Sequence, residues 1–286
     1  DKNAEKSAFW VRSYGSKYRL GMSGDAATEL DGYSGGMQIG TDIAAGGKDT
    51  RHNIGLYAGI GYNEADVAGL RSDLAGKLND TAYSIGAYVT VHNPDKFYIE
   101  GVAQATNHNI DIDYLTYPKH EVDIWSYLGS LEVGVGIPFS SCFTLQPQAQ
   151  LVYQHTGGFG IYTPMLTGDV DIAEHDALQG RLGITGMFKS CEYDFNPFFE
   201  INLIKDFSDS NSVTYRFTDA LYADTKEPVT LSSKPETLFL GGAIGISRKV
   251  SEKNNLTYFL KAEAIYGLKD LASYNYRLNV GIRKMF

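Results

Sequence analysis

The C-terminal segment, residues 274–286 (YNYRLNVGIRKMF), constrains the fold more than any other part of the chain. Apolar and aromatic side chains occupy every second position except 284: Tyr274, Tyr276, Leu278, Val280, Ile282 and Phe286. The alternate positions hold Asn275, Arg277, Asn279, Gly281 and Arg283. A period of two predicts a β-strand with one apolar and one polar face. In lipid such a strand turns its apolar face outward, and closure of the sheet satisfies its backbone hydrogen-bonding groups.

The same alternation recurs in segments of about ten residues separated by turn residues, which is the pattern of a transmembrane β-barrel. We therefore predict an all-β fold, a closed antiparallel transmembrane β-barrel. It has about twelve strands, an even number that suits single-chain bacterial barrels. The predicted strands are residues 9–19, 33–45, 52–63, 81–92, 97–107, 123–139, 143–154, 177–189, 195–207, 236–248, 256–267 and 273–286.

A large soluble β-sandwich shows similar alternation, so the chemistry of the polar faces decides between the two folds. In the segment from Leu145 to Tyr153, three glutamines alternate with Pro147, Ala149 and Leu151. Charged residues also occur in the middle of predicted strands, and we expect them to line a hydrated lumen and to pair with one another rather than to catalyse. They are Arg12, Glu100, Glu132, Arg181, Glu200, Glu263 and Arg277.

Composition excludes several classes of protein. The chain has 286 residues and a formal net charge of -9, which argues against binding to nucleic acid. Its apolar residues never form a run near the ~18 residues of a membrane-spanning helix. There are 20 Tyr, 31 Gly and only 2 Cys, a profile of strands and turns. No charged and then apolar leader precedes residue 10, so we expect that a secretory signal was removed or lay upstream.

The connections between the predicted strands alternate in length. Residues 46–49, 93–96 and 251–254 form short polar turns, whereas long loops are expected near residues 20–32, 64–80, 108–122, 155–176 and 207–235. Short turns face the periplasm in bacterial barrels, so both termini are expected there. Two alternating runs, SVTYRF and EPVTL, suggest a hairpin above the rim within residues 208–234. Cys142 and Cys191 fall in oxidising periplasmic turns, and the sequence leaves open whether they form a disulfide.

An ordered set of segments resembles the C-terminal translocator domains of autotransporters, the type V secretion proteins of Gram-negative bacteria. The set extends over essentially the full chain, and residues 132–184 carry its most specific part. The segments are FWVRSYG (9–15), YSGGMQIGTD (33–42), GLYAGIGY (55–62), EVGVGIPF (132–139), LQPQAQLVYQ (145–154), GRLGI (180–184), PFFEINLIKDF (197–207) and VGIRKMF (280–286). One departure is Lys284, which stands where relatives have an aromatic or apolar residue.

The resemblance implies an outer-membrane anchor and route for an upstream passenger. Residues 1–8 would be the remnant of a linker helix that threads the pore, and residues 9–286 the barrel. The implied partners are outer-membrane lipid and lipopolysaccharide, the barrel-assembly machinery and the passenger itself, with the barrel a monomer. Phe286, with Ile282, Val280 and Leu278, would form the signal that this machinery reads. Some relatives cleave the linker by Asn cyclisation; no Asn–Asn pair occurs in residues 1–8, so we do not expect it here.

The alternative function is a stand-alone outer-membrane barrel, either porin-like or carrying a hydrolytic site at its rim. About twelve strands leave a narrow lumen, which disfavours a wide general porin. The six histidines accompany no catalytic motif and are expected to be solvated, four of them in or near external loops. We expect no enzyme, no metal site and no cofactor, since phosphate-binding glycine loops and ligand-spaced His/Cys clusters are missing from the sequence.

Overall fold

The structure is a computed structural model that describes residues 7–25, 27–47, 49–69, 72–93, 96–114, 119–163, 168–189, 195–208, 210–217, 227–251, 255–269 and 272–286. Every regular element in these residues is a β-strand. The strands are β1 Ala8–Gly24, β2 Glu29–Gly46, β3 Arg51–Gly69, β4 Ser72–Asn93, β5 Phe97–Tyr114, β6 His120–Val135, β7 Ile137–Ser140, β8 Phe143–Thr156, β9 Phe159–Thr163, β10 Gly168–Ile172, β11 His175–Phe188, β12 Phe195–Asp206, β13 Asn211–Phe217, β14 Val229–Pro235, β15 Leu238–Ser251, β16 Leu256–Gly267 and β17 Tyr274–Met285.

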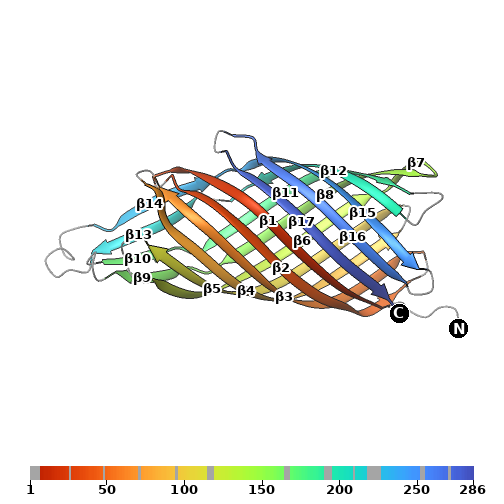
Figure 1. Ribbon diagram of the computed structural model, residues 1–286, viewed down its shortest axis with the longest axis horizontal. Helices are drawn as coiled ribbons and strands as arrows, with labels where there is room; N and C mark the ends of the chain where they lie inside the picture. The colour runs from red at the N-terminus through yellow and green to blue at the C-terminus, as the bar shows by residue number, and fades with distance from the viewer. Residues whose placement is uncertain are drawn as a thin grey trace.

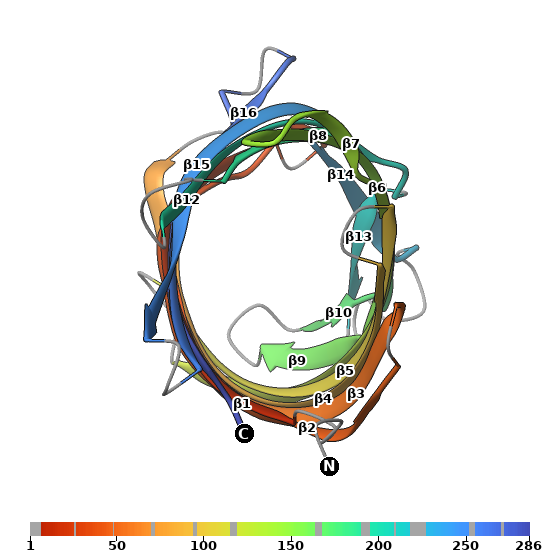
Figure 2. The same ribbon diagram turned by 90° about the vertical axis from the view of Figure 1, so that its right-hand side faces the viewer.

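The sheet closes on itself because the first and last strands pair (Figures 1 and 2). β1 and β17 are antiparallel and in register from Ala8 opposite Met285 to Arg19 opposite Tyr274. β1 pairs on its other side with β2, so neither edge of the seam strands is open along the wall. The wall follows the order β1-β2-β3-β4-β5-β6-β8-β11-β12-β15-β16-β17, with β7 continuing β6 beyond Gly136. This confirms the predicted antiparallel barrel of twelve strands.

The wall carries its apolar side chains on the outer face and its polar side chains on the inner face, the reverse of the arrangement in a soluble protein. Large apolar side chains point outward, and Ile85, Leu182 and Ile244 are 66%, 64% and 69% exposed to the surroundings. Few apolar side chains are buried, whereas Gln38, Asn202 and other polar residues are buried on the inward face. In a soluble protein the apolar face of a strand packs against the core. An apolar outer face of this extent is therefore stable in contact with the hydrocarbon of a membrane.

Aromatic side chains on the inner wall lie over glycines of neighbouring strands. The ring of Tyr57 covers Gly86, and the ring of Phe259 covers Gly281, so a Cβ at either glycine would collide with the ring. Each pair places an aromatic ring where a neighbouring strand has no side chain, and this packing accounts for the abundance of Gly and Tyr in the sequence.

Both ends of the closing seam lie at the rim with the short turns, because Ala8 pairs with Met285. The turns between β2 and β3, β4 and β5, and β15 and β16 lie at this rim, which topology assigns to the periplasm. At the opposite rim one predicted loop is wrong. Residues 64–80 are largely paired strand, since β3 and β4 continue their ladder to Gly69 opposite Ser72. Alternation continues through this segment, and its charged residues Glu64, Asp66, Lys77 and Asp80 lie on the strand extensions.

A small sheet extends the barrel beyond the external rim (Figure 1). β13 and β14 pair antiparallel, which confirms the predicted hairpin within residues 208–234. β10 pairs with both β13 and β9, and β14 pairs with the upper end of β1 from Met22 to Gly24. Residues 155–176, predicted only as a loop, therefore supply two strands of this sheet. Its strands are short and paired across distant loops, a pattern that alternation within one segment does not reveal.

Asp25 links the outer end of β1 to this external sheet, and the stability of this link depends on pH. Its Oδ2 accepts hydrogen bonds from the backbone N–H and the hydroxyl of Ser232, both at 3.0 Å. These bonds hold the pKa of Asp25 below its usual value of 3.8. Because the folded-state pKa is the lower one, the stabilisation is complete above about pH 3.8 and disappears as the pH falls through the folded value.

We therefore expect NMR titration of the Asp25 carboxyl carbon to give a pKa below 3.8. The amide of Ser232 should be protected from hydrogen exchange at neutral pH and lose protection in the Asp25→Ala variant. Asp49→Ala, in a turn at the other rim, is the control and should leave Ser232 protected. An unshifted pKa, or equal protection in both variants, would show that this link does not form.

Candidate functional site

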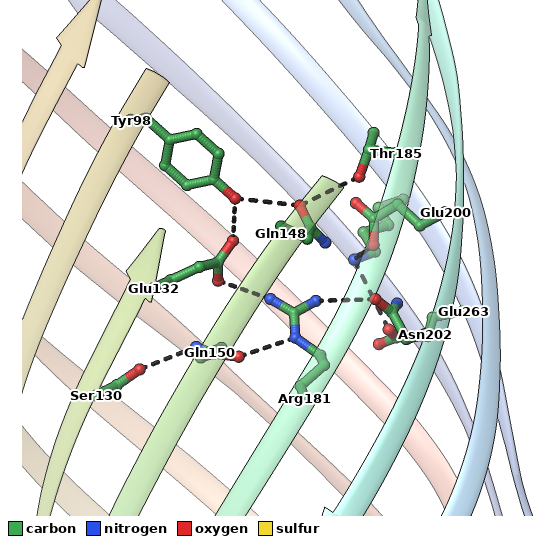
Figure 3. A network of polar contacts seen from close by, with 11 residues as sticks. Tyr98, Ser130, Glu132, Gln148, Gln150, Arg181, Thr185, Glu200, Asn202 and Glu263 are labelled. Carbon is green, nitrogen blue, oxygen red and sulfur yellow. Dashed lines mark hydrogen bonds and ion pairs between the residues drawn. The ribbon is translucent and has the colours of Figure 1, made fainter. Parts of the chain in front are cut away.

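The strongest group of polar contacts on the inner wall surrounds Arg181 (Figure 3). Arg181 projects inward from β11, and its Nη2 lies 2.6 Å from Oε2 of Glu132 on β6. Its Nε donates to Oε1 of Gln150 at 3.0 Å, and its Nη1 lies 3.4 Å from Oδ1 of Asn202. Four strands thus contribute to one guanidinium group. The planar donor fork of arginine suits this role, because its N–H groups point in several directions at once.

Tyr98 and Gln148 extend this network toward the periplasmic rim (Figure 3). The Tyr98 hydroxyl donates to Oε1 of Glu132 and lies 3.1 Å from Oε1 of Gln148. Thr185 donates to the same Gln148 oxygen at 3.2 Å. Glu132 therefore has a partner for each carboxylate oxygen, as a poorly hydrated charge requires.

Glu100 lies directly opposite Glu132 in the register of β5 and β6. Two carboxylates in this position repel each other, and Arg181 compensates this repulsion by neutralising Glu132. Arg12, on β1, donates from Nε to Oε1 of Gln38 at 2.6 Å and lies over the ring of Trp10. The structure thus places Glu100 opposite Glu132, which pairs with Arg181, and gives Arg12 the partners Gln38 and Trp10.

A second cluster lies on β12, β16 and β17. Lys261 Nζ is 2.6 Å from Oε2 of Glu200 and 3.7 Å from Oε1 of Glu263. Arg277 Nη1 lies 3.8 Å from Oε2 of Glu263. Two cations therefore face two carboxylates. The other three residues were predicted from the sequence, but Lys261 was not, although it stands two positions before Glu263 and so shares its face of β16.

Sequence analysis also missed Asp42, whose side chain is fully enclosed at the periplasmic end of the seam. One of its oxygens, Oδ2, accepts from the backbone N–H of Ala8 at 3.0 Å, and the other, Oδ1, accepts from the hydroxyl of Tyr88 at 2.5 Å. Arg283 Nη2, on β17, lies 3.5 Å from Oδ2. Trp10 donates from Nε1 to the Tyr88 hydroxyl at 3.0 Å. Asp42 keeps the inward parity of Gln38 and Gly40, and the register shift follows it, between Asp42 and Ala44.

The prediction that the histidines are solvated is wrong for His108. It lies within β5, and its Nδ1 and Nε2 are 2.8 Å from Oδ2 of Asp80 and 2.9 Å from Oγ of Ser126. The predicted strand ended at residue 107, which placed His108 in a loop. His155 also lies in a strand, at the outer rim, with Nδ1 2.9 Å from Oδ1 of Asp176.

The apolar face of β17 points outward as the alternation predicts. Leu278, Val280, Ile282 and Phe286 are all exposed on the outside of the wall. Lys284 Nζ lies 4.9 Å from the centre of the Phe286 ring, so the one departure from the family pattern contacts the terminal aromatic. Phe286 donates its backbone N–H to the carbonyl of Ser7 at 2.9 Å. The role of these residues as an assembly signal stays a prediction.

Deletion of Phe286 should sharply reduce the yield of assembled barrel. The deletion removes both the terminal aromatic side chain and the last hydrogen bond of the seam. The measurement is the heat-modifiable fraction in outer-membrane preparations. Phe286→Tyr keeps an aromatic ring and should assemble normally. A deletion variant with normal heat-modifiable yield would contradict the role of Phe286.

Of the two cysteines that could form a disulfide, the described residues include only Cys142. Cys142 lies in the turn between β7 and β8, and Cys191 lies outside the described residues. The carbonyl of Cys142 accepts from the backbone N–H of Lys189 at 2.9 Å, so the end of β11 lies beside this turn. We therefore expect a disulfide between Cys142 and Cys191. Peptide mapping without reduction should recover the two cysteines in one cross-linked peptide, and alkylation of both thiols in native protein would exclude the bond.

No group of three His, Cys, Asp or Glu side chains in the described residues is placed to hold a metal ion. No helix of sufficient length and apolarity to cross a membrane occurs in the same part of the chain.

Comparison with known proteins supports the resemblance to autotransporter translocator domains. Residues 9–263 match a family model described as "Autotransporter beta-domain". A stretch of 112 residues is 32% identical to the adhesin BmaC autotransporter of Brucella suis biovar 1 (strain 1330), and it covers 38% of this chain and 3% of that protein. This chain thus spans a small part of that relative's length.

Solved structures show the same fold at low sequence identity. The transport unit of the autotransporter AIDA-I from Escherichia coli superimposes with a TM-score of 0.83 at 18% identity, covering 100% of this chain and 93% of that one. The β-domain of the Bordetella autotransporter BrkA gives a TM-score of 0.68 at 16% identity, covering 97% and 98%.

Proposed function

Because the chain belongs to the autotransporter β-domain family, we propose that it carries an upstream passenger across the outer membrane and then anchors it there. The chain is a translocator β-barrel of the bacterial outer membrane. One observation supports the transport role above the others: a closed wall whose outside is apolar and whose inside carries paired charges and amides. A polar chain segment needs such an interior, because unpaired backbone groups cost several kcal/mol in hydrocarbon.

We propose that the inward charged residues form the wall of this path. They are Arg12, Glu100, Glu132, Arg181, Glu200, Glu263 and Arg277. A cavity of about 480 Å³ on the inner wall is bordered by Arg181, Lys261, Glu263 and Arg277. Ion pairs keep these side chains against the wall, so that they do not close onto a passing segment. Transport along such a wall needs no nucleotide, metal or other cofactor.

The N-terminal end of the chain would connect the barrel to its passenger. We propose residues 1–8 as the end of a linker and residues 9–286 as the barrel. Residues 1–6 lie outside the described part, and β1 begins at Ala8. We propose no Asn cyclisation within residues 1–8, since they hold the single asparagine Asn3.

The proposed partners follow from the two surfaces of the barrel. The apolar outer face would contact lipid and lipopolysaccharide, and β17 would present its outward residues to the barrel-assembly machinery. The closed wall has no open strand edge for pairing with a second copy, so we propose a monomer. The β13–β14 hairpin lies at the external rim, where a passenger leaves the pore, and we propose that it assists secretion.

The decisive experiment follows a passenger encoded upstream of residue 1 in intact cells. With a folded barrel, shown by heat-modifiable migration, the passenger should be digested by protease added outside. A variant lacking β17 cannot close the wall and should leave the passenger protected. A heat-modifiable barrel whose passenger stays protected would overturn the proposal. Large stable conductance from the intact protein in planar bilayers would instead favour a stand-alone channel.

A further inference from the structure

Three side chains on neighbouring strands form a hydrogen-bonded row in the lumen. Asp80 lies on β4, His108 on β5 and Ser126 on β6. Oδ2 of Asp80 is 2.8 Å from Nδ1 of His108, and Nε2 of His108 is 2.9 Å from Oγ of Ser126. A nucleophile bonded to a base, and the base to an orienting carboxylate, is the arrangement of serine acyl-transfer sites.

The register of β4, β5 and β6 places each of these side chains diagonally next to the following one. His108 is opposite Ala82, two residues from Asp80 on the same face of β4. Ser126 is opposite Thr106, two residues from His108 on the same face of β5. Diagonal neighbours on one face are within reach of long side chains. The wall itself, rather than a mobile loop, therefore holds the three groups in position.

The charge of Asp80 determines how the imidazole is protonated. An ionised carboxylate only accepts hydrogen bonds, so Nδ1 of His108 carries the proton and Nε2 of the neutral ring accepts from the Ser126 hydroxyl. The second oxygen of Asp80, Oδ1, is buried and has no partner among the described residues. The negative charge is therefore directed at His108, where it would stabilise an imidazolium formed during a reaction.

The row borders a cavity of about 230 Å³ that also contacts Gln104 and Gln154. Backbone N–H groups of the wall are used in the ladders, so an oxyanion must be stabilised by a side-chain donor. Gln154 on β8 lies on the Ser126 side of the cavity, two residues from the Ser126 partner Thr156. Among the described residues its Nε2 donates to one partner, Thr156 Oγ1, over a long 3.4 Å, which leaves the amide available.

We propose that Ser126, His108 and Asp80 form a serine esterase site in the lumen, with Gln154 as the oxyanion donor. Ser126 Oγ attacks the ester carbonyl carbon while its proton passes to His108 Nε2. The alcohol leaves with that proton, and an acyl-serine remains. Water then attacks the acyl group, gives a proton to Nε2, and the acid is released as Ser126 regains its proton. The volume of the cavity favours short acyl chains.

The test uses the full chain, folded in outer-membrane vesicles. A fluorophosphonate probe should label Ser126, as located by peptide mass spectrometry, and p-nitrophenyl acetate and butyrate should be hydrolysed far faster than the palmitate. Ser126→Ala should abolish both signals. Asp80→Asn keeps the shape of the side chain and should slow ester hydrolysis on the order of 10⁴-fold. Ser130→Ala, on the same face of β6 but not among the residues that line this cavity, is the matched control and should match wild type.

Heat-modifiable migration would verify that each variant is folded, and Asp80→Asn keeps the test valid if Ser126→Ala fails to assemble. The absence of label on Ser126 in the folded barrel would overturn the proposal. So would a His108→Ala barrel labelled as fast as wild type, since Ser126 would then be no more than a wall residue. Passenger exposure should be unchanged in folded Ser126→Ala, which separates this site from the transport function.

Discussion

Replacing Arg181 by Ala is expected to lower the free energy of unfolding of the barrel by about 3 kcal/mol. The change leaves Glu132 without its cation, directly opposite Glu100 in the neighbouring strand. The side chains of Arg181 and Glu132 are only 18% and 16% exposed, so water compensates little of the loss. Gln150 and Asn202 lose a donor at the same time. Urea unfolding in lipid vesicles would measure the difference.

A matched control in the same chain distinguishes this pair from an ordinary surface pair. Arg216 Nε lies 3.0 Å from Oδ2 of Asp171, but the two side chains are 60% and 46% exposed. Arg216→Ala should therefore cost less than about 1 kcal/mol. The double variant Glu132→Gln with Arg181→Met removes both charges and should recover most of the stability. Equal stability of Arg181→Ala and wild type would show that Arg181 is not needed to balance the inner wall.

The barrel wall was predictable because one physical rule acts on every strand. Each strand separates lipid from the lumen, so a period of two appears in each segment and identifies the strand, its inward face and its partners in order. The inward charges Glu132, Arg181 and Glu200 stand at polar positions of this pattern. Which of them meet depends on the register between strands, and register is set by turns and by closure rather than within one strand.

The features that were not predicted from the sequence depend on more than this rule. Asp42 keeps the inward parity of β2, but its partners come from β1, β4 and β17. The strands β9 and β10 pair only across the external sheet, where no lipid imposes an alternation. His108 lies one residue beyond the predicted end of its strand, and its two partners come from different strands of the wall. Each case depends on contacts between segments distant in the sequence.

Asp42 is expected to control the integrity of the seam at its periplasmic end. Asp42→Ala removes the acceptor of the Ala8 N–H and the Tyr88 hydroxyl and leaves Arg283 without its carboxylate. The Asp42 side chain is fully enclosed, so these donors lie where water cannot easily replace it. Loss of buried charge-assisted bonds of this kind should cost about 3 kcal/mol.

The Asp42→Ala variant should lose hydrogen-exchange protection near the periplasmic end of the seam before the rest of the wall is affected, and this gives the sharper test. Hydrogen exchange should accelerate at Ala8 and along the lower half of the β1–β17 ladder, while the ladder of β5 and β6 stays protected. The fluorescence of Trp10 should change as well, because its indole donates to Tyr88 beside Asp42. Asp49→Ala, in the turn at the same rim, is the control and should change stability by less than about 0.5 kcal/mol. Uniform acceleration of hydrogen exchange over the whole wall would contradict a local role of Asp42 at the seam, since Asp42 would then act only through the overall stability of the barrel.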